Sequence, residues 1–281
     1  MIGDFIWTAF DYIGEASIGW CGYPLDKRIF PWNHANCGDL NLSGERRPQS
    51  YLRETLWSDA PVSYIVVTPP VPSFPLNPDK ADWSVWDFPD VVDHWNFPGY
   101  EGKKMTVSVY SNCEQVELFL NGESLGKQEN TADKKNTLVW EVPYAHGILK
   151  AVSYNKGGEV GTATLESAGK VEKIRLSADR TEIVADGNDL SYITLELVDS
   201  KGIRNQLAEE LVEFSIEGDA TIEGVGNANP MSIESFVANS RKTWRGSNLL
   251  VVRSGKSSGR IIVTAKVKAL PVASITITQK K

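Results

Sequence analysis

Short stretches of alternating apolar and polar residues, separated by turn dipeptides, constrain the fold of this chain more than any other feature. Residues 106–110 and 116–120 both alternate, and Asn121-Gly122 follows directly. This dipeptide is strongly preferred in two-residue hairpin turns. Alternation with a period of two indicates strands with one buried face and one solvent-facing side. Short strands joined in this way predict a mainly β chain of the sandwich type.

Two series of candidate strands follow from the same pattern. The first series continues with residues 138–142, 148–154 and 160–165. After a small polar joint at 166–169, the second series comprises residues 173–177, 182–184, 192–198, 212–216, 220–222, 249–253 and 260–265. Seven strands in about 100 residues are typical of an immunoglobulin-like sandwich. Residues 272–278 alternate as well and are expected to form an extra strand or a frayed tail.

Residues 1–60 have a different pattern and do not make a complete domain. The nearly continuous apolar run at 5–10 is typical of a strand buried on both faces, as in a parallel sheet. Residues 48–57 are expected to form a helix that begins at Pro48 and has an apolar stripe. One strand and one helix cannot close a core, so this segment is predicted to be the last βα unit of a larger fold. The five prolines of residues 61–75 indicate an extended linker or an edge segment.

Composition excludes several classes of function. The 29 basic and 36 acidic residues leave a net charge of −7, which argues against a nucleic-acid binder. No apolar run approaches the roughly 20 residues that a membrane-spanning helix needs. The three cysteines match no zinc signature and are expected to be buried free thiols, and we expect no metal ion or cofactor.

Two parts of the sequence resemble family 2 glycoside hydrolases of the β-galactosidase type. Residues 5–15, with the sequence FIWTAFDYIGE, resemble the eighth strand of the catalytic barrel, and residues 38–57 resemble the segment that runs into its last helix. Arg47 stands where the family usually has Lys. Residues 94–122 resemble the sandwich that follows the barrel. The turns around Asp186 and the stretch after Gly224, with Asn227-Ala228-Asn229-Pro230 in place of the family's N-G-D-P, are similar to an invasin-type Ig-like domain.

The resemblance implies a fold and a domain organisation. The chain is expected to contain two Ig-like β-sandwich domains preceded by the last βα unit of a truncated TIM barrel. The barrel remnant would cover residues 1–60, the first sandwich residues 61–168, and the invasin-type Ig-like sandwich residues 169–281. A periplasmic or secreted bacterial location follows from the same resemblance.

The resemblance also implies a function. The chain would be the C-terminal fragment of a retaining hydrolase that acts on β-galactosides or related β-glycosides. Such hydrolysis needs two carboxyl groups about 5–5.5 Å apart, and the family carries them as glutamates on the fourth and seventh barrel strands. Neither strand is in this sequence, so no catalytic residue is expected here and the fragment alone is expected to be inactive. Its partners would be the carbohydrate substrate and the N-terminal part of the parent enzyme.

Candidate substrate-binding residues follow from the same motif. Trp7 is expected to offer its indole face to a sugar, as a Trp does at this point in the family, with packing in the barrel core as the alternative. Trp20 and Trp32 are either pocket walls or loop anchors. Glu15 and Asn36 are further candidates for sugar contact.

Several polar and aromatic residues have a structural and a functional interpretation. Asp11, like Glu15, is expected to orient a loop or to pair with a neighbouring barrel residue rather than to catalyse. A lone His34 is more often a hydrogen-bonded loop residue than a metal ligand. Trp83, Trp86 and Trp95 could form a sugar-binding platform, but packing beside the linker is favoured.

A second function class remains open at this point. The chain could be a non-catalytic carbohydrate-binding or adhesion module built of Ig-like domains. That hypothesis explains residues 61–281 equally well. It does not explain residues 1–60, where a barrel strand and its helix would serve no purpose.

Overall fold

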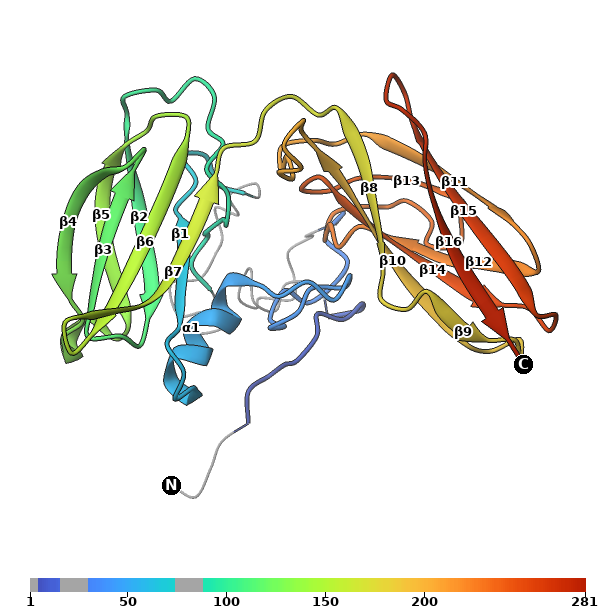
Figure 1. Ribbon diagram of the computed structural model, residues 1–281, viewed down its shortest axis with the longest axis horizontal. Coiled ribbons are helices and arrows are strands. Elements are labelled where there is room, and N and C mark those ends of the chain that lie inside the picture. The colour runs from blue at the N-terminus through green and yellow to red at the C-terminus, as the bar shows by residue number, and fades with distance from the viewer. Residues whose placement is uncertain (1–4, 16–29, 74–87) are drawn as a thin grey trace. The chain divides into compact units, whose positions relative to one another are not determined.

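The computed structural model describes residues 5–15, 30–73 and 88–281, and within them the chain is mainly β with one α-helix. It divides into two compact units, Met1–Ser167 and Ala168–Lys281 (Figure 1). Each unit contains two β-sheets with a hydrophobic core. The predicted mainly β architecture is therefore confirmed, whereas the invasin-type identity of the second unit stays a prediction.

The first unit pairs a three-stranded sheet with a four-stranded sheet. The three-stranded sheet has the order β1-β2-β5 and contains β1 (Ser63–Val67), β2 (Lys104–Ser111) and β5 (Thr137–Pro143). The four-stranded sheet has the order β4-β3-β6-β7 and contains β3 (Gln115–Leu120), β4 (Glu123–Glu129), β6 (Ile148–Asn155) and β7 (Gly158–Glu166). All these strand pairs are antiparallel, and a single 3-10 turn at Ala132–Lys134 precedes β5.

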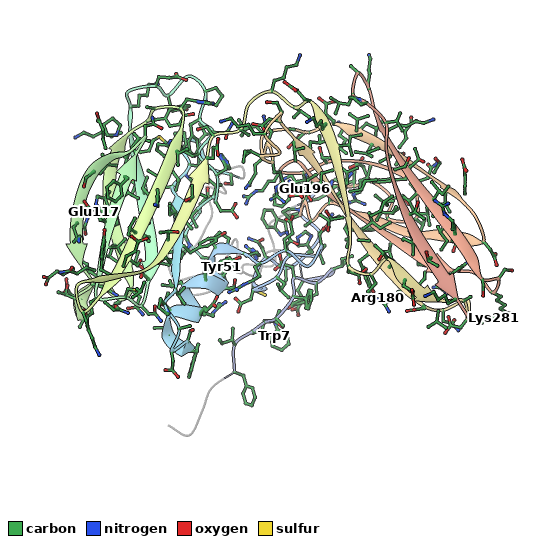
Figure 2. The ribbon with its side chains drawn as sticks, in the orientation of Figure 1. Trp7, Tyr51, Glu117, Arg180, Glu196 and Lys281 are labelled. Carbon is green, nitrogen blue, oxygen red and sulfur yellow. The ribbon has the colours of Figure 1, made fainter. Side chains whose placement is uncertain are left out.

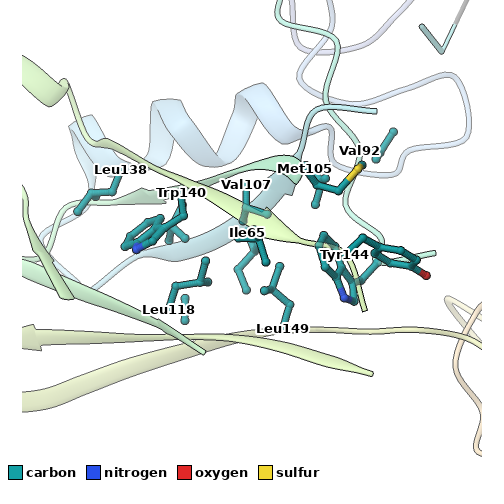
Figure 3. Packing of buried hydrophobic residues seen from close by; sticks show 14 of the residues in the cluster. Ile65, Val92, Met105, Val107, Leu118, Leu138, Trp140, Tyr144 and Leu149 are labelled. Atoms are coloured by element: carbon teal, nitrogen blue, oxygen red, sulfur yellow. The ribbon is translucent and has the colours of Figure 1, made fainter. Parts of the chain in front are cut away.

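The core of the first unit lies between these two sheets. Alternation along each strand places Val107 and Leu118 on facing inner sides, and Leu149 and Trp140 pack beside them (Figure 3). Trp95 is fully buried in the same cluster, and its Nε1 donates a hydrogen bond to the Ala145 carbonyl at 2.8 Å. Burying these side chains stabilises the fold by about 1.5–3 kcal/mol each.

The predicted hairpin at Asn121-Gly122 is confirmed. Both residues have positive φ, 52° and 87°, as a type I′ turn requires. The Asn121 side chain also closes the neighbouring turn, because its Oδ1 accepts from the Ile148 amide at 2.8 Å and its Nδ2 donates to the His146 carbonyl at 3.2 Å. The sequence thus fixes the register between β3 and β4 at this turn.

Two strands of the first unit were not predicted as strands. β1 lies at the edge of its sheet, which agrees with the edge segment expected from the prolines, yet Ile65, Val66 and Val67 are buried. β4 is polar and mostly exposed, with the sequence ESLGKQE, so it carries little alternation. It forms because the hairpin turn returns the chain alongside β3.

The second unit also pairs two sheets. One has the order β12-β14-β10-β8 and contains β8 (Lys173–Ala178), β10 (Leu190–Val198), β12 (Ala220–Gly226) and β14 (Ser247–Ser254). The other has the order β13-β11-β15-β16-β9 and contains β9 (Glu182–Val184), β11 (Leu211–Glu217), β13 (Ser240–Lys242), β15 (Gly259–Val267) and β16 (Ala273–Lys280). β16 pairs with β15 on one side and runs parallel to β9 on the other. Of residues 272–278, all but Val272 therefore belong to β16, and they form an extra strand rather than a frayed tail.

Residues 5–10 differ from the prediction. They form no strand and are largely exposed, with Phe5 98% and Trp7 60% accessible, so the barrel unit expected over 1–60 is not evident. A strand apolar on both faces needs cover on both faces, and the described residues do not supply it. The helix α1 (Pro48–Trp57) is confirmed, although Leu56 of its expected apolar stripe is 64% exposed.

Candidate functional site

The segment 8–11 runs beside the segment 37–40, although a long loop separates them. The Leu40 amide donates to the Ala9 carbonyl at 2.8 Å, and the Asp11 amide donates to the Leu40 carbonyl at 2.9 Å. A single parallel bridge joins Phe10 to Leu40. The chain thereby gathers Trp7, Asp11 and the residues before α1 in one region.

Asp11 is the buried anchor of this region. Its Oδ1 accepts a hydrogen bond from the Gly38 amide at 2.7 Å, and the Arg47 Nη1 donates to Oδ1 at 3.1 Å and to Oδ2 at 3.3 Å. The same Arg47 nitrogen reaches the Gly38 carbonyl at 3.4 Å, and Gln49 Nε2 donates to that carbonyl at 2.7 Å. Asp11 therefore ties the N-terminal segment to the start of α1.

Burial shifts the pKa values of several titratable groups beneath the site, among them Asp11 and His34. Desolvation raises the pKa of Asp11 to about 6, against the lowering effect of Arg47 and of the Gly38 amide. Desolvation also lowers the pKa of His34 to about 4, and the nearby charge of Arg47 acts in the same direction. His34 is therefore neutral near pH 7, and its Nδ1 lies 3.0 Å from the Asn33 Oδ1.

Three side chains of the N-terminal segment form a hydrogen-bonded cluster. It consists of Trp7, Tyr12 and Glu15, and we call it the Trp7 cluster. The Trp7 Nε1 donates to the Tyr12 hydroxyl at 3.0 Å, and the Tyr12 hydroxyl donates to the Glu15 carboxylate. The two rings meet edge to face, with centroids 6.1 Å apart. Desolvation and the Glu15 hydrogen bond raise the pKa of Tyr12 to about 12. The cluster thus offers an exposed indole beside a phenol–carboxylate pair (Trp7 is labelled in Figure 2).

The remaining candidates lie on the loop before α1. Trp32 is buried, and its Nε1 donates to the His34 carbonyl at 2.6 Å, so it anchors this loop. Asn36 is half-buried on the same stretch. The Ala35 amide donates to the Tyr12 carbonyl at 2.8 Å, which holds the loop against the Trp7 cluster. The fold therefore joins Trp7 to Glu15 through the Tyr12 hydroxyl, and it brings the loop that carries Trp32 and Asn36 near them through the backbone.

The other aromatic candidates do not join this site. Trp95 lies in the core of the first unit, which supports a packing role for this residue rather than a role in a sugar-binding platform. Trp20, Trp83 and Trp86 lie outside the described residues. Cys37 and Cys113 are buried free thiols, as expected, whereas Cys21 lies outside the described residues.

Sequence reasoning missed three contributors to the site. Tyr12 links Trp7 to Glu15, Arg47 neutralises Asp11, and Gly38 allows the backbones to approach. A Cβ on Gly38 would lie 2.2 Å from the Asp11 nitrogen. The sequence carried one signal for Tyr12: it is an aromatic residue with a hydroxyl group that lies between the candidates Trp7 and Glu15, five and three residues away.

No three His, Cys, Asp or Glu side chains gather closely enough to hold a metal ion in the part of the chain that the structure describes. Within the same residues, no helix is long and apolar enough to cross a membrane.

Comparisons with family models match both units. Residues 174–276 match the model described as Glycoside hydrolase family 2 C-terminal domain 5. Residues 102–161 match a Domain of unknown function, DUF4982.

Comparisons with known proteins cover nearly the whole chain. The crystal structure of a glycosyl hydrolase family 2 member from Bacteroides cellulosilyticus is 99% identical with a TM-score of 0.98, over 100% of this chain and 36% of that one. Beta-galactosidase BoGH2A from Bacteroides ovatus is 31% identical over 99% of this chain and 28% of its own length. A beta-glycosidase from Bacteroides vulgatus is 25% identical with a TM-score of 0.78, over 96% of this chain and 30% of its own. The chain spans about a third of the length of these proteins.

Proposed function

Because the chain belongs to glycoside hydrolase family 2 and corresponds to the C-terminal portion of such a protein, we propose that it forms one wall of a glycoside-binding pocket. The parent enzyme would be a retaining hydrolase of β-galactosides or related β-glycosides. One observation carries this proposal: the exposed Trp7 cluster stands on a rigid buried base made by Asp11 and Arg47. A fixed, exposed indole beside hydrogen-bonding groups is a suitable surface for a sugar ring.

In this proposal the apolar N-terminal segment completes the catalytic barrel of the parent enzyme as its last βα unit. Two observations support it. The exposed run at Phe5 and Ile6 is an apolar surface that soluble proteins rarely leave uncovered. The parallel bridge between Phe10 and Leu40, followed by α1, is the start of the hydrogen-bonding pattern that parallel strands require. Residues 61–168 and 169–281 would then be the sandwich domains that follow the barrel, the second of them Ig-like and invasin-type.

The catalytic carboxyl groups would come from the rest of the parent enzyme. Asp11 is poorly placed for catalysis, because it is 4% exposed and paired with Arg47. Glu15 is exposed, but one carboxylate cannot supply both the acid/base and the nucleophile. We therefore propose that Glu15 holds the Tyr12 hydroxyl and contacts the sugar, with Trp32 and Asn36 completing this wall.

The test uses the parent enzyme with Trp7→Ala and, as a matched control, Trp57→Ala. Trp57 is 80% exposed on α1 and lies outside the proposed pocket wall. Loss of a sugar contact is expected to lower kcat/KM by about ten- to hundredfold at unchanged Tm. The control should keep kcat/KM within about twofold. Near-normal kcat/KM per titrated active site in Trp7→Ala would overturn the assignment.

Activity of the chain by itself is a second test. We expect no hydrolysis of a chromogenic β-galactoside above background, since in this proposal the chain supplies neither of the two catalytic carboxyl groups. Turnover that disappears in Glu15→Gln would show that the catalytic machinery lies in this chain.

We also propose a periplasmic or secreted location in the bacterial source. The proposal rests on the glycan substrate class and is checked by fractionation of cells that express the tagged parent protein. Recovery of the protein in the cytoplasmic fraction alone would refute it.

A further inference from the structure

A groove of about 590 Å³ lies on the four-stranded sheet of the first unit, away from its core. Phe119 of β3 and Lys150 and Val152 of β6 line it, and they alternate with the core residues Leu118 and Leu149. The groove therefore lies over the outer face of the two inner strands of the sheet. Its volume is within the range of about 300–1,000 Å³ that small-ligand sites occupy.

One end of the groove is held rigid by a polar network around Tyr154. The Lys127 ammonium lies 3.5 Å from the centre of the Tyr154 ring, and the Tyr154 hydroxyl donates to the Glu117 carboxylate at 3.3 Å. The Glu117 carboxylate also accepts from the Ser124 hydroxyl at 2.6 Å (Glu117 is labelled in Figure 2). A ring fixed in this way contacts a ligand with little loss of conformational entropy.

Two charged side chains on the rim are not used by the fold. Lys150 stands opposite Phe119 across the β3–β6 pair, and Glu159 stands opposite Tyr154 across the β6–β7 pair. Both are exposed, and neither makes a hydrogen bond or an ion pair with another described residue. They supply one donor group and one acceptor group at the edge of an aromatic and aliphatic floor.

From this arrangement we infer that the groove is a second carbohydrate site, separate from the Trp7 cluster, that binds a neutral oligosaccharide chain. The apolar floor suits the C–H face of a sugar ring, and Lys150 and Glu159 suit its hydroxyl groups. The rim charges cancel, so the groove favours a neutral ligand over a polyanion. Because β3 and β6 are paired on both sides, an added peptide strand has no free backbone to pair with here.

The inference is tested on the whole 281-residue chain by affinity electrophoresis in gels that contain soluble β-galactan, arabinogalactan or hydroxyethylcellulose. Tyr154→Ala removes the fixed ring, and Lys150→Ala removes an exposed donor that the fold does not use. The matched control is Tyr192→Ala, since Tyr192 is a tyrosine 42% exposed on β10 of the second unit. Circular dichroism melting checks that each variant folds.

We expect retardation in at least one gel, weakened about tenfold in both groove variants and unchanged in the control. Retardation in none of the three gels overturns the inference, as does retardation that both groove variants keep. If only Trp7→Ala abolishes the retardation, the binding belongs to the Trp7 cluster, and this outcome also overturns the inference. The result is independent of the proposed function, which is judged by hydrolysis in the parent enzyme.

Discussion

The carboxylate of Asp11 and the guanidinium of Arg47 form a buried ion pair, with Oδ1 and Nη1 3.1 Å apart, although the residues are 36 positions apart in the chain. The Asp11 side chain is 2% exposed and that of Arg47 is 17% exposed. One nitrogen of Arg47 makes all of the contacts to Asp11 and to the Gly38 carbonyl described above. This pair joins the segment of the Trp7 cluster to the helix α1.

Removal of the charge at Arg47 should destabilise this region strongly. Arg47→Met leaves the Asp11 carboxylate buried without a charged partner, which is expected to cost about 3–5 kcal/mol. Arg47→Lys should cost less than about 1 kcal/mol, because a single ammonium can take the place of the single nitrogen that makes these contacts. Urea unfolding of both variants checks this, and equal losses would contradict the single-nitrogen interpretation.

Gly38 should tolerate no larger side chain. An added Cβ would lie 2.2 Å from the Asp11 nitrogen and 2.6 Å from the Leu40 carbonyl oxygen, both of them backbone atoms that cannot turn away. Gly38→Ala is therefore expected to separate the two segments and abolish the slow hydrogen exchange of the Asp11 and Leu40 amides. Gly158→Ala is the control, since its Cβ would meet only one atom at 3.8 Å. Slow exchange retained in Gly38→Ala would show that the backbones can adjust.

Much of the β architecture could be predicted because alternation and turn chemistry are local. Asn121-Gly122 specifies its own backbone conformation, and the strands on either side follow. β13 was not predicted because its three residues, Ser240–Lys242, are all polar and show no apolar alternation. The apolar run at 5–10 forms no strand in this structure. A strand forms only when another strand pairs with it, and the described residues supply no such neighbour along this run.

The site could be predicted less completely for a physical reason. The family resemblance marks Trp7 and Glu15 as individual residues, but the base beneath them depends on contacts between distant parts of the chain. Nothing in the spacing of Asp11 and Arg47 indicates an ion pair. The clash that requires Gly38 is likewise visible only once the two backbones lie side by side.

His34 and Asp11 should give the region opposing dependences on pH. The pKa of His34 falls from 6.5 in the unfolded chain to about 4, so its contribution to stability is lost as pH falls through that window. The pKa of Asp11 rises from 3.8 to about 6, so its contribution is lost as pH rises between those values. Over their shared range the two contributions partly cancel.

Replacement of His34 should reveal the Asp11 contribution alone. From pH 6.5 to pH 4 the wild type loses the stability that the His34 pKa shift contributes, whereas His34→Gln has none to lose. The change in the free energy of local unfolding over this range should therefore be up to about 3 kcal/mol more favourable in His34→Gln than in the wild type. Hydrogen exchange of the Ala35 and Gly38 amides at the two pH values measures it. As an independent check, the proton NMR signal of His34, recorded with His94 and His146 both changed to Gln, should titrate near pH 4. A midpoint near 6.5 would contradict the burial argument.

Asn112 should be the main polar connection between the end of α1 and the first sandwich. Its Nδ2 donates to the carbonyls of Ser58 and Ala60, both at 2.9 Å, and its Oδ1 accepts from the Val62 amide at 2.8 Å. Asn112→Ala removes three hydrogen bonds and is expected to lower the free energy of unfolding by about 2–4 kcal/mol. Asn112→Asp keeps the acceptor but places a carboxylate against two carbonyls, so at pH 7 it should be at least as damaging.

The pH dependence of Asn112→Asp and Asn112→Ala distinguishes a loss of the Asn112 hydrogen bonds from a simple loss of side-chain volume. Protonation of the introduced carboxyl restores one donor, so the Tm of Asn112→Asp, relative to that of Asn112→Ala, should rise as pH falls from 7 to 4. The Tyr51 ring, stacked on Tyr64 with centroids 3.6 Å apart, holds α1 to β1 by a contact without charge and should keep both variants folded. A Tm difference between the two variants that does not change with pH would show that the Asn112 side chain acts only by filling space.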